Sequence, residues 1–289
     1  MILSVVVISY NTKELTKQTL QSIFDKKIYN YTYEVIVVDN ASTDGSIEML
    51  KKEFPQVKLI LSDKNLGFSK GNNLAIKQSQ GQYILLLNSD TVIIDDCLEK
   101  SIRYMEKHKS VGALGCKVLL SNGELDHACK RGFPTPEASL YYMLKMDKLF
   151  PESTKFGQYT LNYLSQDEIN EVDSVTGAFM MVRREAFDQV GLLDEDFFMY
   201  GEDIDWCYRI KTAGWKIIYF PESKIIHYKG GSSKKKRWKV MYEFHRAMYL
   251  FYHKHYAKKY NFAITLAVYL GISIKLALSL IINVGRRRE

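Results

Sequence analysis

Three carboxylates are crowded into one short turn of this chain. The segment GEDID places Glu202, Asp203 and Asp205 within four residues, directly after the apolar run Phe197–Met199. Crowding carboxylates beside apolar side chains is costly, because each charge loses water and repels its neighbours. A cost of this kind suggests a chemical role, and we favour general-base catalysis, in which a carboxylate takes a proton from a reacting group. The alternative is that the three residues only cap the helix that follows.

A second acidic element lies far upstream. The segment LLLNSD ends in Asn88, Ser89 and Asp90. Mg²⁺ and Mn²⁺ prefer oxygen ligands and bridge protein carboxylates to phosphates. Asp90 is therefore our candidate metal ligand, and His227 could complete the metal shell with an imidazole nitrogen. The alternatives are an ordinary strand-end turn at 88–90 and a purely structural histidine.

The first half of the chain contains the elements that would position Asp90. Short Val/Ile-rich runs, typical of strands buried on both faces, alternate with segments whose apolar residues recur at helical spacing. This alternation predicts βαβ units and an α/β fold with a Rossmann-like, mostly parallel sheet. Ligands of such sheets bind beyond the carboxyl ends of the strands. Three polar clusters fall at those ends, namely Ser9-Tyr10-Asn11, Asp39-Asn40 and Asn88-Ser89-Asp90.

The second half is less regular. Residues 130–173 are rich in proline and aromatic residues, which predicts a long excursion over the sheet. We expect a strand at 172–182, a helix after GED with Trp206 on its apolar face, and a final strand at 216–220. No GxGxxG follows the first strand and no GxxxxGK[ST] occurs in the sequence, so dinucleotide-dependent enzymes and P-loop NTPases are disfavoured.

Charge and cysteine content add two expectations. The net charge is +7, but residues 224–289 carry 15 Lys or Arg and only two Asp or Glu, so the body is acidic and the tail basic. Such a tail suggests an anionic partner. The four cysteines form no CxxC pair, so we expect free thiols in a reducing compartment. The apolar run after Met1 lacks a cationic leader, so we expect no signal peptide.

Taken in order, these motifs resemble the family 2 glycosyltransferases of the GT-A fold, especially their bacterial rhamnosyltransferase branch. Asn88 stands where the family's DxD motif has its first Asp, and the rhamnosyltransferase branch commonly reads NxD there. The resemblance implies a GT-A domain over 1–228, with a nucleotide-binding half at 1–120 and an acceptor-binding half at 121–228. The matching pieces span about residues 3–230 and are SVVVISYN, VVDNASTDGS, NLGFSKGNN, LLLNSDT, VTGAFMMVRREAF, GLLDEDFFMYGEDIDWCYR and the late His227.

The resemblance implies a nucleotide-sugar donor at the strand ends. Asp39 would accept the imide N–H of uracil or thymine, although it could instead cap the following turn. Gly67, between Asn65 and Asn72, would let the backbone approach the nucleotide closely, although this stretch could simply begin a helix. Asn88 would contact the ribose or the sugar. The other implied donor-binding residues are Ser9, Tyr10, Asn11, Ser89, Asp90 and Gly177.

The resemblance also implies the chemistry. Asp203 aligns with the second carboxylate of the family's ED pair and would take the proton from the acceptor hydroxyl as it attacks the anomeric carbon. Glu202 would position the acceptor or modulate Asp203. A divalent cation, Mg²⁺ or Mn²⁺, on Asp90 and His227 would neutralise the departing diphosphate. Nothing indicates a covalent glycosyl intermediate, so we expect one displacement with inversion. Arg209 would pair with a carboxylate or the diphosphate.

We therefore expect an inverting transferase for surface-glycan synthesis, which moves a sugar onto a lipid-linked or polysaccharide acceptor. The resemblance favours rhamnose from dTDP-rhamnose, and a UDP-hexose donor is the alternative within the family. A protein that binds nucleic acid through its basic tail is the alternative of another class. That alternative leaves both acidic clusters unexplained, so we expect no nucleic-acid partner.

Residues 229–289 are predicted to form a basic, aromatic and helical tail. Lysines and arginines, including the run Lys234–Arg237, interleave with aromatic residues, as at an anionic membrane surface. A single-stranded nucleic-acid site and a solvated helix face are the alternatives.

The apolar segment 262–284 is long enough to cross a bilayer, but Lys275 lies near its middle. Gly271, Lys275, Ser279 and Asn283 form a polar stripe, which favours a helix lying in the membrane interface over a span. Packing on a second copy of the chain is a further alternative. Because the run at 286–288 would face lipid phosphates, we expect a cytoplasmic protein, peripheral on the inner face of the cell membrane.

Overall fold

The computed structural model describes residues 1–26, 28, 30–228 and 237–285, without the side chains of 237 and 283–285. The predictions for the basic runs at 234–237 and 286–288, and for the side chain of Asn283, therefore lie outside the described residues. The strands are β1 (Leu3–Ser9), β2 (Tyr33–Asp39), β3 (Lys58–Leu61), β4 (Tyr83–Asn88), β5 (Thr91–Ile94), β6 (Val111–Leu120), β7 (Asn170–Val172), β8 (Phe179–Arg183) and β9 (Lys216–His227).

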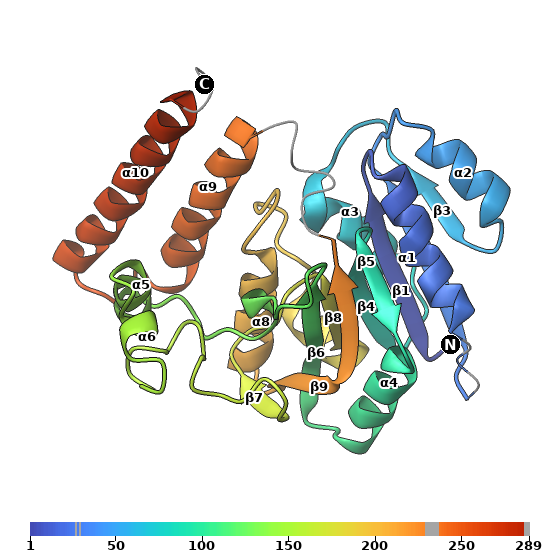
Figure 1. Ribbon diagram of the computed structural model, residues 1–289, viewed down its shortest axis with the longest axis horizontal. Coiled ribbons are helices and arrows are strands. Elements are labelled where there is room, and N and C mark those ends of the chain that lie inside the picture. Colours follow the sequence, from blue (N-terminus) through green and yellow to red (C-terminus); the bar gives the residue numbers. More distant parts are fainter. Residues whose placement is uncertain (27, 29, 229–236, 286–289) are drawn as a thin grey trace.

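The helices lie between these strands and after the last of them (Figure 1). They are α1 (Lys13–Asp25), α2 (Ser46–Glu53), α3 (Gly67–Ile76), α4 (Cys97–Lys107), the 3-10 turn η1 (His127–Cys129), α5 (Pro136–Met143), α6 (Met146–Leu149), α7 (Arg184–Val190), α8 (Glu202–Thr212), α9 (Arg237–His255) and α10 (Phe262–Gly285).

Within the described residues, one nine-stranded sheet runs through the molecule in the order β3-β2-β1-β4-β8-β6-β9-β5, and β7 pairs with β9. β3, β2, β1 and β4 are parallel to one another, and β6 is parallel to β9. β8 is antiparallel to β4 and β6, and β5 is antiparallel to β9. The predicted α/β fold with a mostly parallel sheet is confirmed.

Register brings the polar strand ends together. In the parallel pairs, Ser9 lies opposite Asp39 and Ile8 lies opposite Asn88. Because β1, β2 and β4 end at the same edge of the sheet, their polar successors gather there, as expected for an α/β ligand site.

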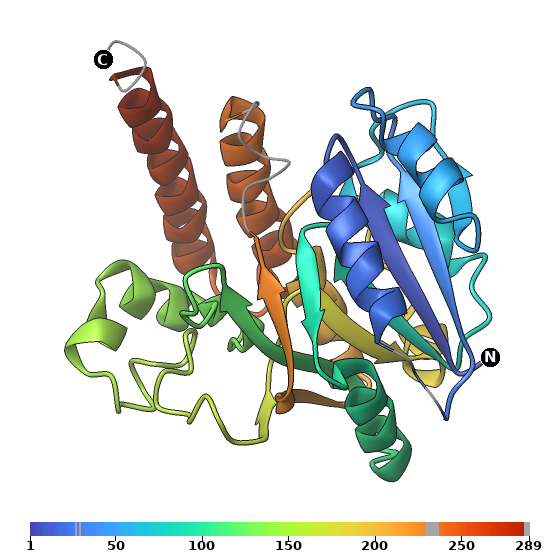
Figure 2. The same cartoon turned by 45° about the vertical axis from the view of Figure 1, so that its right-hand side comes forward.

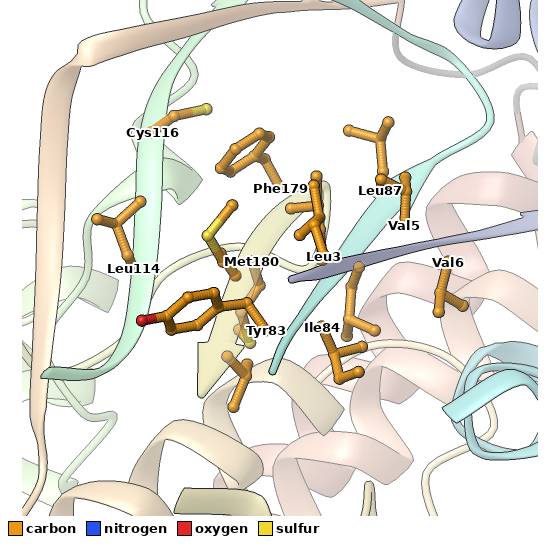
Figure 3. Close-up of a cluster of buried hydrophobic side chains, with 14 of the residues drawn as sticks. Leu3, Val5, Val6, Tyr83, Ile84, Leu87, Leu114, Cys116, Phe179 and Met180 are labelled. Atoms are coloured by element: carbon orange, nitrogen blue, oxygen red, sulfur yellow. The ribbon is translucent and has the colours of Figure 1, made fainter. Parts of the chain in front are cut away.

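The central strands are apolar on both faces because helices cover the sheet. Figure 3 shows side chains of β1, β4, β6 and β8 packed together, among them Val5, Ile84 and Phe179, which are fully buried. Burying each such side chain contributes roughly 1.5–3 kcal/mol. This shared core fixes the position of β8 beside β4, and so the position of the segments that follow each of them.

Two strand predictions were wrong in their bounds. The predicted strand at 172–182 is two strands, β7 and β8, because they pair with different neighbours and a turn separates them. The final strand runs past 220 to His227 as β9, because a register shift opposite Cys116 and Lys117 accommodates Pro221. Proline has no N–H for a ladder hydrogen bond, so an irregularity is needed there.

The excursion at 130–173 contains α5, α6 and β7 rather than being irregular throughout. Figures 1 and 2 show α5 and α6 on the same side of the molecule as α9 and α10, which lie antiparallel to each other. Tyr260, in the turn between these two helices, donates a hydrogen bond to Glu137 of α5 at 2.9 Å. The late helices are therefore anchored to the excursion.

Among the described residues, one helix, α10, is long and apolar enough to cross a membrane, and none of its most apolar stretch is buried in the structure. The predicted apolar C-terminal helix is thus present and exposed. All four cysteines lie within the described residues and are buried free thiols, as expected.

Candidate active site

A cavity of about 750 Å³ lies between the strand ends on one side and α5, α8 and α9 on the other. Asp90 and Asp203, which are distant in sequence, both line it. The two acid-bearing turns therefore face a common space. The predicted site residues that line it are Tyr10, Asn65, Gly67, Asn88, Ser89, Asp90, Gly177, Glu202, Asp203 and His227.

Four predicted donor-binding residues do not line this cavity. The Ser9 hydroxyl is buried against Thr16 Oγ1 at 3.1 Å, and Asn72 donates to the carbonyl of Phe68 within its own helix. Asn11 is exposed, and its Oδ1 accepts a hydrogen bond from the backbone N–H of residue 43. Asp39 is fully buried one residue before Asn40, which does line the cavity.

Asp39 has two different carboxylate oxygens. Oδ1 accepts the backbone N–H of Ser42 at 2.7 Å, which is the turn-capping role considered as its alternative. Oδ2 is buried without a hydrogen-bond partner among the described residues. A buried carboxylate oxygen without a donor is costly, so a ligand N–H at this position would lower the free energy of the site.

The end of β4 and the end of β9 bring Asp90 and His227 together. Thr91 pairs with His227 in the antiparallel register, and the Asp90 carbonyl accepts the N–H of Tyr228. Asp90 Oδ1 lies 3.0 Å from His227 Nε2. Asn88 Nδ2 lies 3.4 Å from the same ring nitrogen.

Asp126, which the sequence analysis did not select, completes this cluster. Its Oδ2 lies 3.6 Å from His227 Nδ1, and its Oδ1 accepts the N–H of Ala128 at the start of η1. Burial lowers the pKa of His227, but hydrogen bonds and negative charge from Asp126 and Asp90 outweigh it and raise that pKa to about 9. The ring is therefore held between two carboxylates.

The donor set fits a divalent cation that is shared with a phosphate ligand. No group of three or more His, Cys, Asp or Glu within the described residues is arranged to hold a metal by itself. Asp90 and His227 nevertheless supply one carboxylate oxygen and one imidazole nitrogen side by side at the cavity wall. Mg²⁺ and Mn²⁺ sites in phosphate-handling enzymes commonly use only one or two protein ligands, with substrate phosphates and water as the others.

Asp203 is held by three hydrogen-bond donors. Its Oδ2 accepts a hydrogen bond from Arg131 Nη2 at 2.6 Å and from the N–H of Gly177 at 3.2 Å, and its Oδ1 accepts the N–H of Ile204 at 2.8 Å. A side chain at 177 would crowd the Phe68 ring at 3.2 Å. The glycine thus permits the close approach of the Phe68 ring to the segment that precedes β8.

Arg131 is a site residue that the sequence analysis missed. It lies in the proline-rich excursion and reaches the site because its backbone pairs with Ser174 through two hydrogen bonds of 2.9 Å. No pattern in the sequence around Arg131 predicts this pairing. Only the fold places its guanidinium group beside Asp203.

Glu202 lies in different surroundings from Asp203. Its side chain is buried, and Oε2 has no hydrogen-bond partner among the described residues. Burial and the adjacent charge of Asp203 raise the pKa of Glu202 to about 8. The turn therefore carries one carboxylate fixed by Arg131 and one carboxyl group that titrates near neutral pH.

Asp205 points away from the cavity. Its Oδ2 accepts from Arg209 Nε at 2.8 Å, which confirms a carboxylate partner for Arg209, and its Oδ1 lies 2.7 Å from His255 Nε2 on α9. Asp205 is therefore a structural link between α8 and α9.

Gly67 joins the two halves of the chain. Its φ is +80°, and a Cβ there would lie 2.4 Å from the carbonyl oxygen of Phe198. The next residue, Phe68, donates its N–H to that same carbonyl at 2.8 Å. Glycine is thus required here by a neighbouring backbone as well as by the left-handed conformation.

Comparison with known protein families gives one match to the chain. The model described as Glycosyl transferase family 2 covers residues 4–191. This segment contains the strand ends and Asp90, and it stops shortly before the GEDID turn.

Several curated relatives are similar over 75–80% of this chain. They include the O-antigen biosynthesis protein RfbC of Myxococcus xanthus, at 27% identity over 80% of this chain but only 18% of that protein. The N-acetylglucosaminyl-diphospho-decaprenol L-rhamnosyltransferase of Mycobacterium tuberculosis is 26% identical, over 75% of this chain and 73% of that protein. Rhamnosyltransferase WbbL of Escherichia coli is 28% identical, over 78% and 82% respectively.

Solved structures share the fold. The mannosyltransferase PcManGT from Pyrobaculum calidifontis, in complex with GDP-Man and Mn²⁺, matches 96% of this chain and 71% of its own, with a TM-score of 0.59 at 18% identity. GalNAc-T7, with UDP, GalNAc and Mn²⁺, matches 79% of this chain and 44% of its own, with a TM-score of 0.60 at 15% identity. At these identities the likeness establishes the GT-A fold.

Proposed function

The chain belongs to glycosyl transferase family 2, and from that premise we propose an inverting enzyme that transfers a sugar from a nucleotide donor to an acceptor hydroxyl in surface-glycan synthesis. The observation that carries this proposal is that Asp90 and Asp203, more than a hundred residues apart, line one cavity of about 750 Å³. A cavity with separated acidic groups suits a reaction in which a proton leaves at one end and a diphosphate leaves at the other.

In the proposed reaction, Asp203 takes the proton of the acceptor hydroxyl. The hydroxyl oxygen forms a bond to the anomeric carbon of the donor sugar while the bond from that carbon to the diphosphate oxygen breaks. The products are the glycosylated acceptor with inverted configuration, a protonated Asp203 and the nucleoside diphosphate. Arg131 and the Gly177 N–H hold the carboxylate in place, which keeps its orientation fixed for proton transfer.

At the other end, Asp90 and His227 are the residues that would hold a divalent cation, Mg²⁺ or Mn²⁺, which when bound would neutralise charge on the diphosphate. We assign to Asn88, which lies beside His227 on the cavity wall, a hydrogen bond to a ribose or sugar hydroxyl. The amide carries no charge, so it orients the ligand without adding to the acidic cluster.

Rhamnose from dTDP-rhamnose is the donor that we favour. Two of the relatives described above are rhamnosyltransferases by name, and Asn88 follows the NxD pattern of that branch. The buried Oδ2 of Asp39, which lacks a donor among the described residues, is suited to the imide N–H of thymine. A UDP-hexose remains the alternative donor, since uracil presents the same imide.

We propose a lipid-linked acceptor and a location on the cytoplasmic face of the membrane. The exposed apolar helix α10 supports contact with a membrane, and the M. tuberculosis relative is named for an acceptor that carries a lipid diphosphate.

A donor screen tests this function. The purified full chain would be heated with dTDP-rhamnose, UDP-glucose, UDP-N-acetylglucosamine or GDP-mannose, each with and without Mn²⁺. We expect dTDP-rhamnose with Mn²⁺ to raise the Tm most, because a ligand that binds only the folded state stabilises it. Slow release of dTDP from the same donor would be measured in parallel. Absence of stabilisation and of nucleotide release with every donor would contradict the proposal.

A further inference from the structure

Lys275 is the only charged residue in the sequence of α10. Its side chain is half-buried on the face of α10 that is turned toward α9, and it lines the cavity. Its ammonium group lies 5.8 Å from the centre of the Phe244 ring of α9. Within the described residues, no carboxylate lies within ion-pair distance of it. A cation in apolar surroundings without an anionic partner is costly and is a functional candidate.

A second lysine lies on the same cavity. Lys239, at the start of α9, rests 3.8 Å from the centre of the Phe198 ring, in the turn that precedes the catalytic carboxylates. The acidic residue nearest along this face of α9, Glu243, also lines the cavity, but its Oε2 lies 3.5 Å from Arg246. Both lysines therefore lie against aromatic rings rather than carboxylates, so an anion that entered the cavity would find them without an ionic partner among the described residues.

Apart from Glu243, the part of the cavity wall that α9 forms between these lysines and the GEDID turn is apolar. Val240, Phe244, Met248 and Phe251 of α9 all line the cavity at helical spacing. Ala247 of the same helix packs next to Gly201, so this helix passes directly beside Glu202 and Asp203. Lys239 lies eight residues before Ala247, which corresponds to ~12 Å along the helix. The two lysines and the carboxylates of the GEDID turn therefore line the same cavity.

The face of α10 adjoining Lys275 is an exposed apolar stripe. Leu266, Leu270, Ile274 and Leu278 recur every four residues and are each 44–59% exposed. Leu140, Leu144 and Leu149 on or beside α5 and α6 are exposed as well, and Figures 1 and 2 place these helices on the same side as α10. An apolar surface of this extent next to basic residues suits a membrane interface.

We propose that the outer end of the cavity, between α9 and α10, binds the diphosphate of a polyprenyl-diphosphate-linked acceptor. Lys275 and Lys239 are its cationic contacts, and the exposed stripe of α10 lies in the membrane interface. This inference rests on the proposed function and adds to it the chemical class of the acceptor and the residues that select it. The diphosphate would sit at the lysines, the attached sugar would extend along α9 to Asp203, and the isoprenoid chain would leave past α10 into the bilayer.

Vesicle binding tests the site without requiring turnover. The full chain would be floated with phosphatidylcholine vesicles that contain a polyprenyl diphosphate, and with vesicles that contain phosphatidylglycerol at equal total charge. We expect the wild type to prefer the diphosphate vesicles by about tenfold or more, as loss or gain of a charge-assisted contact gives. Lys275→Met and Lys239→Met should each remove that preference, whereas Lys275→Arg should keep it.

Lys258→Met is the matched control, because Lys258 is exposed in the turn after α9, outside the cavity. It should retain the preference of the wild type. All variants should show the wild-type rise in Tm with donor, which would establish that they are folded and that the donor site is intact. Equal binding to the two anionic vesicles, or a Lys275→Met variant that binds diphosphate vesicles as the wild type does, would overturn the inference. A vesicle preference without any donor response would instead count against the proposed function alone.

Discussion

The neighbouring carboxyl groups Glu202 and Asp203 lie in different environments at the start of α8. Asp203 is fixed by Arg131 and two backbone N–H groups, whereas Glu202 is buried with one oxygen unpartnered. Two adjacent groups of the same chemistry are thereby given different surroundings. The first, which we propose as the base, is held in one orientation, and the second adds negative charge to the turn only when the pH rises.

Replacement of the proposed base tests the first role. Asp203→Asn keeps the shape of the side chain but removes the proton acceptor, so we expect sugar transfer to fall by about 10²–10⁴-fold. Donor binding, measured as the rise in Tm with donor and Mn²⁺, should persist. Asp188→Asn, at an exposed position of α7, is the matched control and should transfer at the wild-type rate. Normal turnover by Asp203→Asn would exclude this carboxylate as the base.

The second role predicts a dependence of stability on pH. The pKa of Glu202 is about 8 in the folded protein against 4.5 for the free side chain, so between these values only the folded state holds the proton. The free energy of unfolding then falls by up to about 1.4 kcal/mol per pH unit across this window. Glu202→Gln removes this penalty, so its advantage over the wild type should grow from pH 5 to pH 8.

Urea unfolding of both proteins at pH 5, 6.5 and 8 would measure the difference. Glu185→Gln, at an exposed position of α7, should show no such trend and serves as the control. A stability difference between Glu202→Gln and the wild type that is the same at all three pH values would contradict the buried, proton-holding state of Glu202.

Among the elements, α8 and α9 are coupled by a buried carboxylate. Asp205 is 1% exposed and is satisfied by Arg209 of its own helix and by His255 at the end of α9. A buried charge that loses one partner is costly. This contact therefore holds α9 against the helix whose first residues are Glu202 and Asp203.

His255→Ala should lower the free energy of unfolding by about 1–3 kcal/mol, because Asp205 would remain buried with one partner fewer. His253→Ala is the matched control: its ring is exposed and contacts Tyr269 of α10, so its effect should stay within about 0.5 kcal/mol. Equal effects of the two substitutions in urea unfolding would show that the contact between Asp205 and His255 stabilises the fold no more than an exposed contact does.

The elements also differ in how far sequence alone could predict them. β1, β2 and β4 are continuous apolar runs followed by polar residues, so their existence and the gathering of their ends were predictable. β6 was missed because Gly112 and Gly115 weaken its pattern. Glycine is needed at both positions because residues distant in sequence pack against them. A Cβ at 112 would lie 2.6 Å from Trp215 Cβ, and a Cβ at 115 would lie 2.5 Å from Val175 Cβ.

For the whole molecule, sequence predicted the acidic groups of the site but not the residues that surround them. Asp90, Asp203 and His227 stand in ordered motifs, and the structure brings all three to one cavity. Arg131 reaches the site through the pairing of the excursion with Ser174, and Asp126 through the hydrogen bond of its N–H to Val118 of β6. No local pattern encodes either contact. The orientation of Lys275 toward the cavity likewise depends on how α10 packs against α9.

The first and second halves of the chain cannot move apart as two rigid bodies. β4 and β8, one from each half, pair along five residues in the middle of the sheet. A second contact between the halves joins the backbone at Gly67 and Phe68 to the backbone carbonyl of Phe198. Opening a hinge there would break the central sheet and its core. Entry and exit of the reactants must therefore be governed by the segments around the rim, so mutations that alter turnover without altering the chemistry are expected in α5, α9 and the turn before α8 rather than in the strands.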